Sequence, residues 1–297
     1  KEPPIVMVMT DVTRPIGWRL SRRGRGLLST IAGVATTLLL LLALTFIIGR
    51  VLPLDPVAAI VGDDADQSTY RMVYEQLGLD RPVLEQFAIF VGRMLRGDFG
   101  IALRTGHPVL EDIARVFPAT IELATVTIVF GAGLGVPLGV YAAVHRNRLP
   151  DHLVRVISLR GYSTPVFWLG LVALLVFYAK LGWVGGGGRL DVYNVGLVVP
   201  QTGFLLIDSL LQGEHEVFWS AVRHIVLPSA VLGYSAIAYI SRMTRSFMLE
   251  QLEQEYVIAA RAKGVPRWRT IWSHAFLNIR VQVVTIVALS YGAMLEG

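Results

Sequence analysis

Long apolar stretches, separated by polar segments, most constrain what this chain of 297 residues can fold into. A helix needs about 20 mainly apolar residues to cross the hydrocarbon core of a bilayer. The clearest such stretch is Leu27–Gly49, with Thr36, Thr37 and Thr45 as its main polar interruptions. It is longer than the core of a signal peptide and lacks a convincing cleavage site. We therefore expect residues 27–49 to form a retained first transmembrane helix.

Four more stretches have the length and composition of membrane-spanning helices. Hydrophobic residues make up 54% of the chain and charged residues only 16%, and the mean hydropathy is +0.56, which excludes an ordinary soluble domain. We expect an all-α membrane protein with five transmembrane helices. Because the fifth would end outside, we also expect a sixth that this sequence lacks. The four stretches are Pro118–Val144, Val156–Ala179, His224–Met248 and Ile279–Leu295.

Arginine placement predicts which segments face the cytosol, because cytosolic loops carry an excess of Lys and Arg. The N-terminal segment 1–26 contains five arginines, and the connections 145–155 and 249–278 are also basic. Residues 51–117, by contrast, carry ten acids against six arginines. We therefore expect a cytosolic N-terminus, with 51–117 and 180–223 outside.

Several kinds of chemistry are missing from the sequence. The chain has no cysteine, which excludes disulfides, thiol catalysis and Cys-based metal sites. Its six histidines show no metal-ligand spacing. No lysine follows a glycine, so the chain has no phosphate loop and should not hydrolyse ATP by itself. We expect no catalytic residue, no metal, no cofactor in this chain and no nucleic-acid partner.

The external region 50–117 is expected to contain a short amphipathic helix. Asp80 is the expected N-cap, Pro82 suits the first turn and Gly97 marks the end. Such a helix either caps the spans or offers a docking surface to an external protein, and both roles can hold. Its apolar residues at helical spacing are Leu84, Phe87, Val91, Met94 and Leu95. The candidate docking residues are Asp80, Arg81, Arg96 and Asp98.

A polar, basic segment, Glu255–Pro266, stands between two long apolar ones. Its small residues predict a thin helix that stops at Gly264, since Gly suits the left-handed position just after a helix. Pro266 suits the first turn of the next helix. We predict a rigid helix–turn–helix at the membrane surface that a cytosolic partner can grip. Its candidate residues are Glu255, Tyr256, Ala259, Ala260, Arg261, Ala262, Lys263, Gly264, Pro266 and Arg267.

Three features inside the spans allow more than one interpretation. Glycines at every fourth position from Gly131 to Gly139 permit close helix packing, either within the bundle or at a subunit interface. Glu122 is a helix N-terminal acid favoured by the dipole, or else a proton or cation site. A break at Ser163-Thr-Pro165 either lines a translocation pathway or is a structural kink. The candidate pathway residues are Ser163, Thr164, Pro165, Phe167 and Trp168.

Five motifs, in order, resemble the B-type transmembrane permease subunits of dipeptide/oligopeptide ABC importers. The Glu255–Pro266 segment is similar to the cytosolic loop of importer permeases, in which two small residues and three variable ones precede a glycine. His274-Ala275 and Asn278 follow as in the peptide group. The other motifs are Leu52-Pro-Leu-Asp-Pro56, Leu77–Pro82 with Arg96–Gly100, Ser163–Gly170, and His224-Ile-Val-Leu-Pro228.

The resemblance implies a type I ABC importer permease in the plasma (inner) membrane of a prokaryote. In that family a second homologous permease, in a heterodimer here, completes a pathway for di- or oligopeptides. Two ATP-binding cassette subunits or domains use ATP and Mg²⁺, and each receives a cytosolic coupling helix. An external binding protein delivers the substrate, and membrane lipid surrounds the complex. The implied permease core is 118–297, with its coupling loop at 249–278.

Two other functions compete with this one. A secondary transporter would need ionisable groups and repeats within the membrane, and Glu122 is the single acid well inside a span. A membrane receptor or assembly subunit without ATPase partners would use 51–117 for binding, but leaves the Glu255–Pro266 segment unexplained. The exact substrate does not follow from the sequence.

Overall fold

A computed structural model describes residues 17–51, 56–62, 66–76, 78–102 and 104–296. The first sixteen residues of the basic N-terminal segment, and positions 52–55 of the Leu52–Pro56 motif, lie outside the described residues. Every element of regular structure in the described ranges is a helix, apart from one antiparallel bridge between Ile101 and Pro108. The expected all-α fold is therefore confirmed. Between Asp112 and Ile113 the chain divides into two compact units.

The described residues of the first unit form four complete helices. They are α1 (Gly17–Val51), α2 (Pro56–Val61), α3 (Gln67–Gln76) and α4 (Val83–Leu95). Residues 26–49 of α1 are long and apolar enough to cross a membrane, as expected. The Phe46 ring of α1 lies 5.5 Å from that of Phe87 and 5.7 Å from that of Phe90, between centroids. The amphipathic helix α4 therefore packs an aromatic face on α1.

The predicted end of α4 is confirmed, but its predicted N-cap is wrong. Gly97 adopts a left-handed φ of 80°, and its N–H bonds the Met94 carbonyl while the Asp98 N–H bonds the Arg93 carbonyl. This pair of bonds closes the helix in a Schellman motif. At the other end Pro82, not Asp80, occupies the N-cap position, and no side chain caps the helix. The fixed φ of Pro82 suits the start of the helix, and the acid in the first turn is Glu85.

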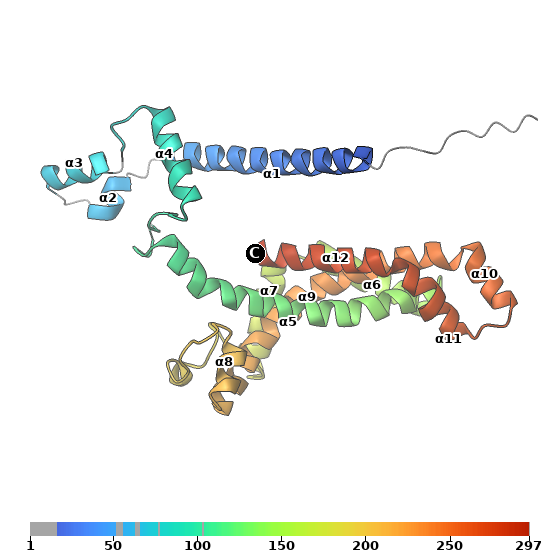
Figure 1. The fold of residues 1–297 in the computed structure, drawn as a ribbon. Coiled ribbons are helices and arrows are strands. Elements are labelled where there is room, and N and C mark those ends of the chain that lie inside the picture. Colours follow the sequence, from blue (N-terminus) through green and yellow to red (C-terminus); the bar gives the residue numbers. More distant parts are fainter. Residues whose placement is uncertain (1–16, 52–55, 63–65, 77, 103, 297) are drawn as a thin grey trace, which may run out of the picture. The chain divides into compact units, whose positions relative to one another are not determined.

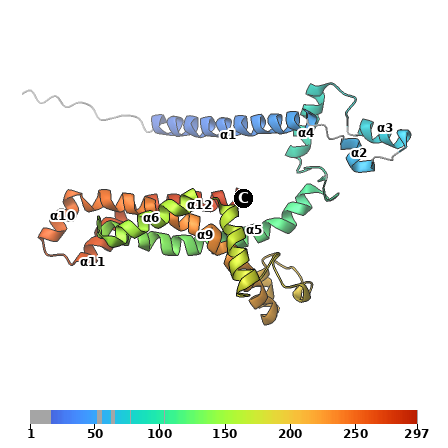
Figure 2. The ribbon, with the colours of Figure 1, turned by 180° about the vertical axis from the view of Figure 1, so that it is seen from behind.

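The second unit is built on long helices (Figures 1 and 2). They are α5 (Val109–Val144), α6 (Leu149–Ser163), α7 (Val166–Ala173) with the π-helical η1 (Leu174–Lys180), the short η2 (Val192–Asn194), α8 (Leu205–Leu211), α9 (His215–Leu252), α10 (Glu255–Ala262), α11 (Arg267–Arg269), the π-helical η3 (Thr270–Phe276) and α12 (Leu277–Glu296). The helix α8 has only seven residues, which is too short to span a membrane.

All five predicted helix starts were too late, since α1 begins at Gly17 rather than Leu27 and α6 at Leu149 rather than Val156. α5 begins at Val109 rather than Pro118, α9 at His215 rather than His224, and the last helix runs from Arg267 through η3 into α12. Hydropathy marks only the membrane-embedded part of a helix, whereas these helices continue beyond it. Since α5 has 36 residues and α9 has 38, both exceed the length that a bilayer requires.

Five membrane crossings fit the described structure if the broken third span counts as one. Four helices satisfy the length and composition for spanning, and α6 with α7–η1 form a bent pair. The break at Ser163-Thr-Pro165 is confirmed, and the two halves make an angle of 98°. Thr164 is the C-cap residue at which α6 ends, and its N–H donates a hydrogen bond to the Arg160 carbonyl. The third span therefore turns sharply rather than kinking slightly.

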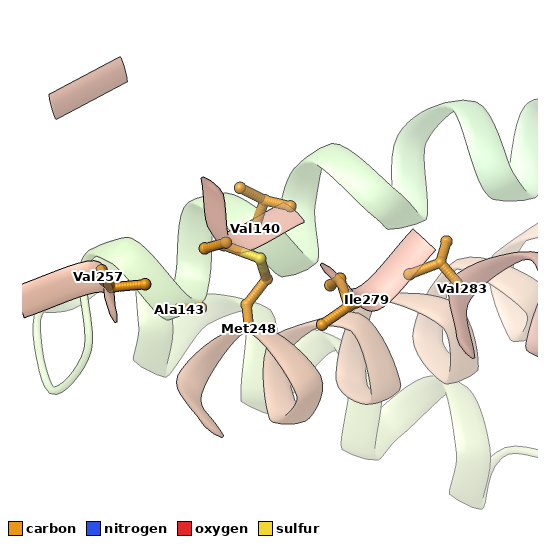
Figure 3. Packing of buried hydrophobic residues seen from close by; sticks show 7 residues of the cluster. Val140, Ala143, Met248, Val257, Ile279 and Val283 are labelled. Atoms are coloured by element: carbon orange, nitrogen blue, oxygen red, sulfur yellow. The ribbon is translucent and has the colours of Figure 1, made fainter. Parts of the chain in front are cut away.

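The helices of the second unit pack around α9. In both views α5, α6, α9 and α12 lie along one another, with α10 and α11 at one end and α8 at the other (Figures 1 and 2). A buried cluster at the α10 end joins α5, α9, α10 and α12 (Figure 3). Its members are Val140, Ala143, Met248, Val257, Ala275, Ile279 and Val283.

The glycine face of α5 packs inside this bundle. A Cβ at Gly131 would lie 2.8 Å from the Ala236 Cβ, and one at Gly139 would lie 2.6 Å from the Ser241 carbonyl oxygen. Gly135 approaches Ile240 in the same way. All three neighbours belong to α9, so the structure supports internal packing over a subunit interface for this face.

Candidate functional site

The Glu255–Pro266 segment folds as predicted, into a helix, a left-handed turn and a second helix. α10 ends in a Schellman motif: the Gly264 N–H bonds the Arg261 carbonyl at 3.0 Å and the Val265 N–H bonds the Ala260 carbonyl at 3.1 Å. Gly264 has a φ of 78°, which most L-residues resist. Pro266 takes the N-cap position of α11, one residue before the first turn. The bend is thus fixed by these two hydrogen bonds and by the fixed φ of Pro266, while Gly264 permits the left-handed turn.

α10 is anchored to the bundle by one apolar face. Val257 is fully buried in the cluster of Figure 3, where the labelled Met248 side chain points toward Val140. Ala260, one turn later, is also buried. Because both side chains are small, the α10 axis can lie close to α5 and η3. The helix therefore moves with the bundle rather than as a free loop.

Hydrogen bonds add a polar link between α10 and two long helices. The Tyr256 hydroxyl donates to Gln251 Oε1 at 2.7 Å and accepts from Asn278 Nδ2 at 2.9 Å. Asn278 also donates to the His274 carbonyl at 2.8 Å. Through one hydroxyl, α10 is tied to the end of α9 and to the start of α12. The sequence reading named Tyr256 and Asn278 but did not foresee that they meet.

The opposite face of α10 is open. Glu255, Ala259, Arg261, Ala262 and Lys263 are exposed, and so is Ile258 at 55%. Of the three alanines expected to make the helix thin, two therefore face outward and Ala260 packs inward. Cations continue past the turn, where Arg267 donates to the Val144 carbonyl at 3.4 Å and the Arg269 guanidinium lies 5.9 Å from the Trp268 ring centroid. The exposed surface therefore combines small side chains with basic ones and is held rigidly.

A second anchor near this end of the bundle was missed by the sequence reading. Asp151 is fully buried at the start of α6 and accepts hydrogen bonds from Arg245 of α9, one of them from Nη2 at 2.9 Å. It also accepts from the Asn147 N–H at 2.9 Å, and Asn147 has a φ of 60°. Arg146 in turn pairs with Glu253, just before α10. An acid at a helix start was visible in the sequence, but a partner 94 positions away was not.

The candidate pathway residues are brought together by the break between α6 and α7. Phe167 and Trp168 are 72% and 51% exposed on α7, and Ser163 is exposed at the end of α6. Thr164 Oγ1 donates to the Arg160 carbonyl at 2.8 Å, and Pro165 is the N-cap of α7. Two exposed aromatic rings beside a sharp turn fit a surface that another element covers.

The candidate docking residues form no single cluster. Arg81 pairs with Glu85 at 2.8 Å near the start of α4, whereas Arg96 and Asp98 follow its end. A helix of 13 residues separates the two groups by about 20 Å. All four residues are exposed, and Asp98 Oδ1 accepts from the Gly100 N–H at 3.0 Å. Each end of α4 therefore presents its own charged group.

Glu122 does not act as a helix N-terminal acid, which was one of the two interpretations of its position in the sequence. It lies in the interior of α5 rather than in its first turn, so the helix dipole does not explain it. Its carboxylate is buried and accepts hydrogen bonds from Arg189 Nη2 and from the Leu206 N–H, both at 2.7 Å. Glu122 thus ties the 181–214 connection to α5. Arg189 had not been singled out.

The 181–214 connection is ordered by close packing and by a second acid. A Cβ at Gly185 would lie 2.4 Å from the His224 ring, and one at Gly186 would lie 2.7 Å from the Tyr178 ring, so the first two of the four glycines at 185–188 are closely packed. Asp208 is buried and accepts bonds from the N–H groups of Gln201, Thr202 and Gly203. Burial raises the pKa of Asp208, but these hydrogen bonds outweigh it and the net pKa lies below its ordinary value.

Comparison with known proteins places these features in a family. The family model "Binding-protein-dependent transport system inner membrane component" matches residues 135–297. A second, "Binding-prot-dependent transport system membrane comp, N-term", matches residues 25–124. Together these segments contain α10, the broken third span and the amphipathic helix α4.

Several curated proteins are similar along most of the chain. The probable D,D-dipeptide transport system permease protein DdpB of Escherichia coli K12 is 41% identical over 278 residues, covering 94% of this chain and 79% of that protein. The di/tripeptide transport system permease protein DppB of Pseudomonas aeruginosa UCBPP-PA14 is 42% identical, covering 86% and 75%. The glutathione transport system permease protein GsiC of Escherichia coli O1:K1 / APEC is 34% identical, covering 89% and 77%. The chain therefore belongs to the family of binding-protein-dependent transport system inner membrane components and is a multi-pass permease of type I fold.

Proposed function

We propose that this permease is the transmembrane subunit of an ATP-driven importer for di- or oligopeptides. With a second homologous permease it forms the pathway, and an external binding protein delivers the substrate. The printed names of its relatives support a peptide substrate, since two of them are dipeptide or di/tripeptide transport permeases. ATP and Mg²⁺ are bound by partner ATPase subunits, because this chain has no phosphate loop.

The observation that carries this proposal is the geometry of α10. A coupling element must be exposed to a partner on one face and fixed to the membrane helices on the other. α10 exposes Ile258 and Arg261 while Val257 is fully buried. Its ends are held by the Gly264 turn and by the Tyr256 hydroxyl. A push on the exposed face therefore reaches α9 and α12 with little loss.

Charge and the position of α10 support one membrane orientation. The N-terminal segment and the 145–155 and 249–278 connections are basic, which favours the cytosolic side for all three. In the second unit α10 and α8 lie at opposite ends (Figures 1 and 2). With α10 in the cytosol, the 181–214 connection faces the outside, where the binding protein would dock. The ends of α4 offer Asp80, Arg81, Arg96 and Asp98 as further contacts for that protein.

The pairing of Glu122 weakens the secondary-transporter alternative. A proton or cation site needs a carboxylate that exchanges its partner, but both Glu122 oxygens accept hydrogen bonds within the fold. The feature that most favoured such a transporter thus has a structural explanation.

The proposal is tested by purifying the tagged full-length protein from its native membranes in mild detergent. We expect a second permease and ATPase subunits in the same complex, with vanadate-sensitive ATP hydrolysis and, after reconstitution, ATP-driven peptide uptake. A folded chain that purifies without any ATPase would contradict the proposal.

A further inference from the structure

The second unit contains a cavity that the coupling mechanism does not use. It has a volume of about 240 Å³ and lies among α5, the 181–214 connection, the start of α8 and α9. We call it the outer pocket, because it lies at the α8 end of the unit, which the proposed orientation places outside. Its walls include Leu123, Leu206 and Pro228, and its charged or titratable groups are Glu122, Arg189 and His224.

This combination of apolar walls and a few convergent polar groups is typical of small-ligand sites. Sites that enclose a whole small molecule usually have volumes of about 300–1,000 Å³. The outer pocket is smaller, so it suits one end of a ligand rather than all of it. The chemical group that it can bind therefore depends on which polar side chain in the pocket still has free hydrogen-bonding capacity.

Glu122 has little capacity left. Its side chain is 9% exposed, one oxygen accepts from Arg189 and the other from the Leu206 N–H. A substrate ammonium group would have to displace one of these donors. His224 is similarly engaged, since its Nδ1 bonds the Ser220 carbonyl at 2.8 Å and its Nε2 lies 3.9 Å from Asp191 Oδ1. Neither group is a strong candidate for binding a ligand charge.

Arg189 is different. A guanidinium has five N–H donors in a planar fork, and within the described structure its one hydrogen bond goes to Glu122. Its side chain lines the pocket and is 43% exposed overall, so donors other than the one bonded to Glu122 remain accessible. The ion pair with buried Glu122 holds the fork in place. Such a fork matches a carboxylate in size and geometry.

We propose that the outer pocket is a subsite for the carboxylate end of an incoming peptide, with Arg189 as its binding group and Glu122 as the residue that positions Arg189. This inference rests on the proposed peptide-import function. It assigns this subunit a direct contact with substrate at the outer end of the pathway, in addition to the choice made by the binding protein.

The test uses the complete transport complex in lipid nanodiscs without the external binding protein. Binding of alanyl-phenylalanine and of alanyl-phenylalanine amide is measured by equilibrium dialysis. Losing a charge-assisted hydrogen bond corresponds to roughly 10- to 100-fold in affinity. We expect the free carboxylate to bind at least about tenfold more tightly than the amide, Arg189→Gln to abolish this difference, and Arg189→Lys to retain part of it.

Two further variants separate binding from folding. Arg223→Gln removes an exposed arginine of α9 that does not line the pocket, and should leave the carboxylate preference unchanged. Glu122→Gln/Arg189→Gln leaves no unpaired buried charge, and should still lack the preference. If the double variant regains it, the loss in Arg189→Gln arose from the stranded Glu122 charge and the subsite is wrong.

Other outcomes also decide the question. Equal binding of the two peptides by the wild-type complex, or an equal loss of both in Arg189→Gln, overturns the subsite, as would be seen if Arg189 bound lipid phosphate instead. The same preparation is assayed for ATP-driven uptake with binding protein present. Intact uptake without carboxylate preference refutes the subsite alone, whereas absence of peptide uptake refutes the proposed function.

Discussion

Asn278 at the start of α12 donates a hydrogen bond of 2.9 Å to the hydroxyl of Tyr256 in α10, and that hydroxyl donates in turn to Gln251 at the end of α9. One phenol thus connects the exposed helix to two membrane helices. We expect Tyr256→Phe to weaken coupling while leaving the buried Val257 contact intact. A neutral hydrogen bond contributes about 0.5–1.5 kcal/mol, so peptide transported per ATP hydrolysed should fall about fivefold.

The control for Tyr256→Phe is Tyr239→Phe. Tyr239 lies in the same bundle, and in the described structure its hydroxyl has no hydrogen bond. Reconstituted complexes are compared for uptake and ATP hydrolysis. If both variants keep the wild-type ratio, the hydrogen-bonded bridge has no part in coupling.

The Gly264 turn should tolerate Asn far better than Val. With a φ of 78°, a β-branched residue would be strained, whereas Asn adopts left-handed backbone readily. A Cβ at Gly264 meets no other atom within 4 Å, so backbone strain rather than a clash is tested. We expect Gly264→Val to remain in the membrane but to lose most ATP-driven uptake, with Gly264→Asn close to wild type.

Gly97 provides a matched control because it ends α4 in the same Schellman motif with a φ of 80°. Gly97→Val should leave ATP hydrolysis coupled to whatever uptake remains. If ATP hydrolysis is uncoupled from uptake in Gly97→Val, or if Gly264→Val shows normal uptake, the α10 turn has no specific role in coupling.

The glycine face of α5 predicts a stability difference between two substitutions on one helix. At Gly139 a Cβ would press on the Ser241 carbonyl and on Thr244, while at Gly133 it meets nothing within 4 Å. Overpacking costs about 1–3 kcal/mol, and Gly→Ala at an open helical site stabilises by up to about 1 kcal/mol. Gly139→Ala should therefore lower the thermal midpoint of the purified complex and Gly133→Ala should not. Equal midpoints would mean that the α5–α9 contact is looser than described.

The loop held by Asp208 should open in acid. Because its pKa in the folded protein lies below the ordinary 3.8, the carboxylate stabilises the loop fully above pH 3.8, and this stabilisation fades as the pH falls through the folded pKa. Hydrogen exchange at the amides of residues 201–203, corrected for intrinsic rates, should accelerate below pH 3.8. In Asp208→Asn the exchange should be fast already at neutral pH and should lose this pH dependence. If hydrogen exchange in the wild type does not accelerate below pH 3.8, the Asp208 carboxylate does not hold this loop in place.

Sequence reasoning found the features that depend on local backbone rules. The left-handed turns at Gly264 and Gly97, the restart at Pro266 and the break at Pro165 each follow from what Gly and Pro allow. The number of spans followed from apolar length. These predictions needed no knowledge of distant partners.

What the sequence could not provide was pairing between distant residues. Glu122 with Arg189, and Asp151 with Arg245, join positions 67 and 94 apart. Helix starts were misplaced because α5 and α9 extend beyond the apolar stretch that identified them. The π-helical turn of η3 carries no sequence signal that we recognised. The outer pocket depends entirely on such long-range contacts.

The most direct test of the coupling role is chemical crosslinking from the exposed face of α10. The chain has no cysteine, so Ile258→Cys introduces a single thiol at a position that is 55% exposed. Val192→Cys places the same thiol at a 90% exposed position on η2, in the 181–214 connection. With a short thiol-to-amine crosslinker in the intact complex, we predict that Ile258→Cys joins this chain to an ATPase subunit and that Val192→Cys does not. A complex that contains the ATPase but yields no such product from Ile258→Cys would contradict the account.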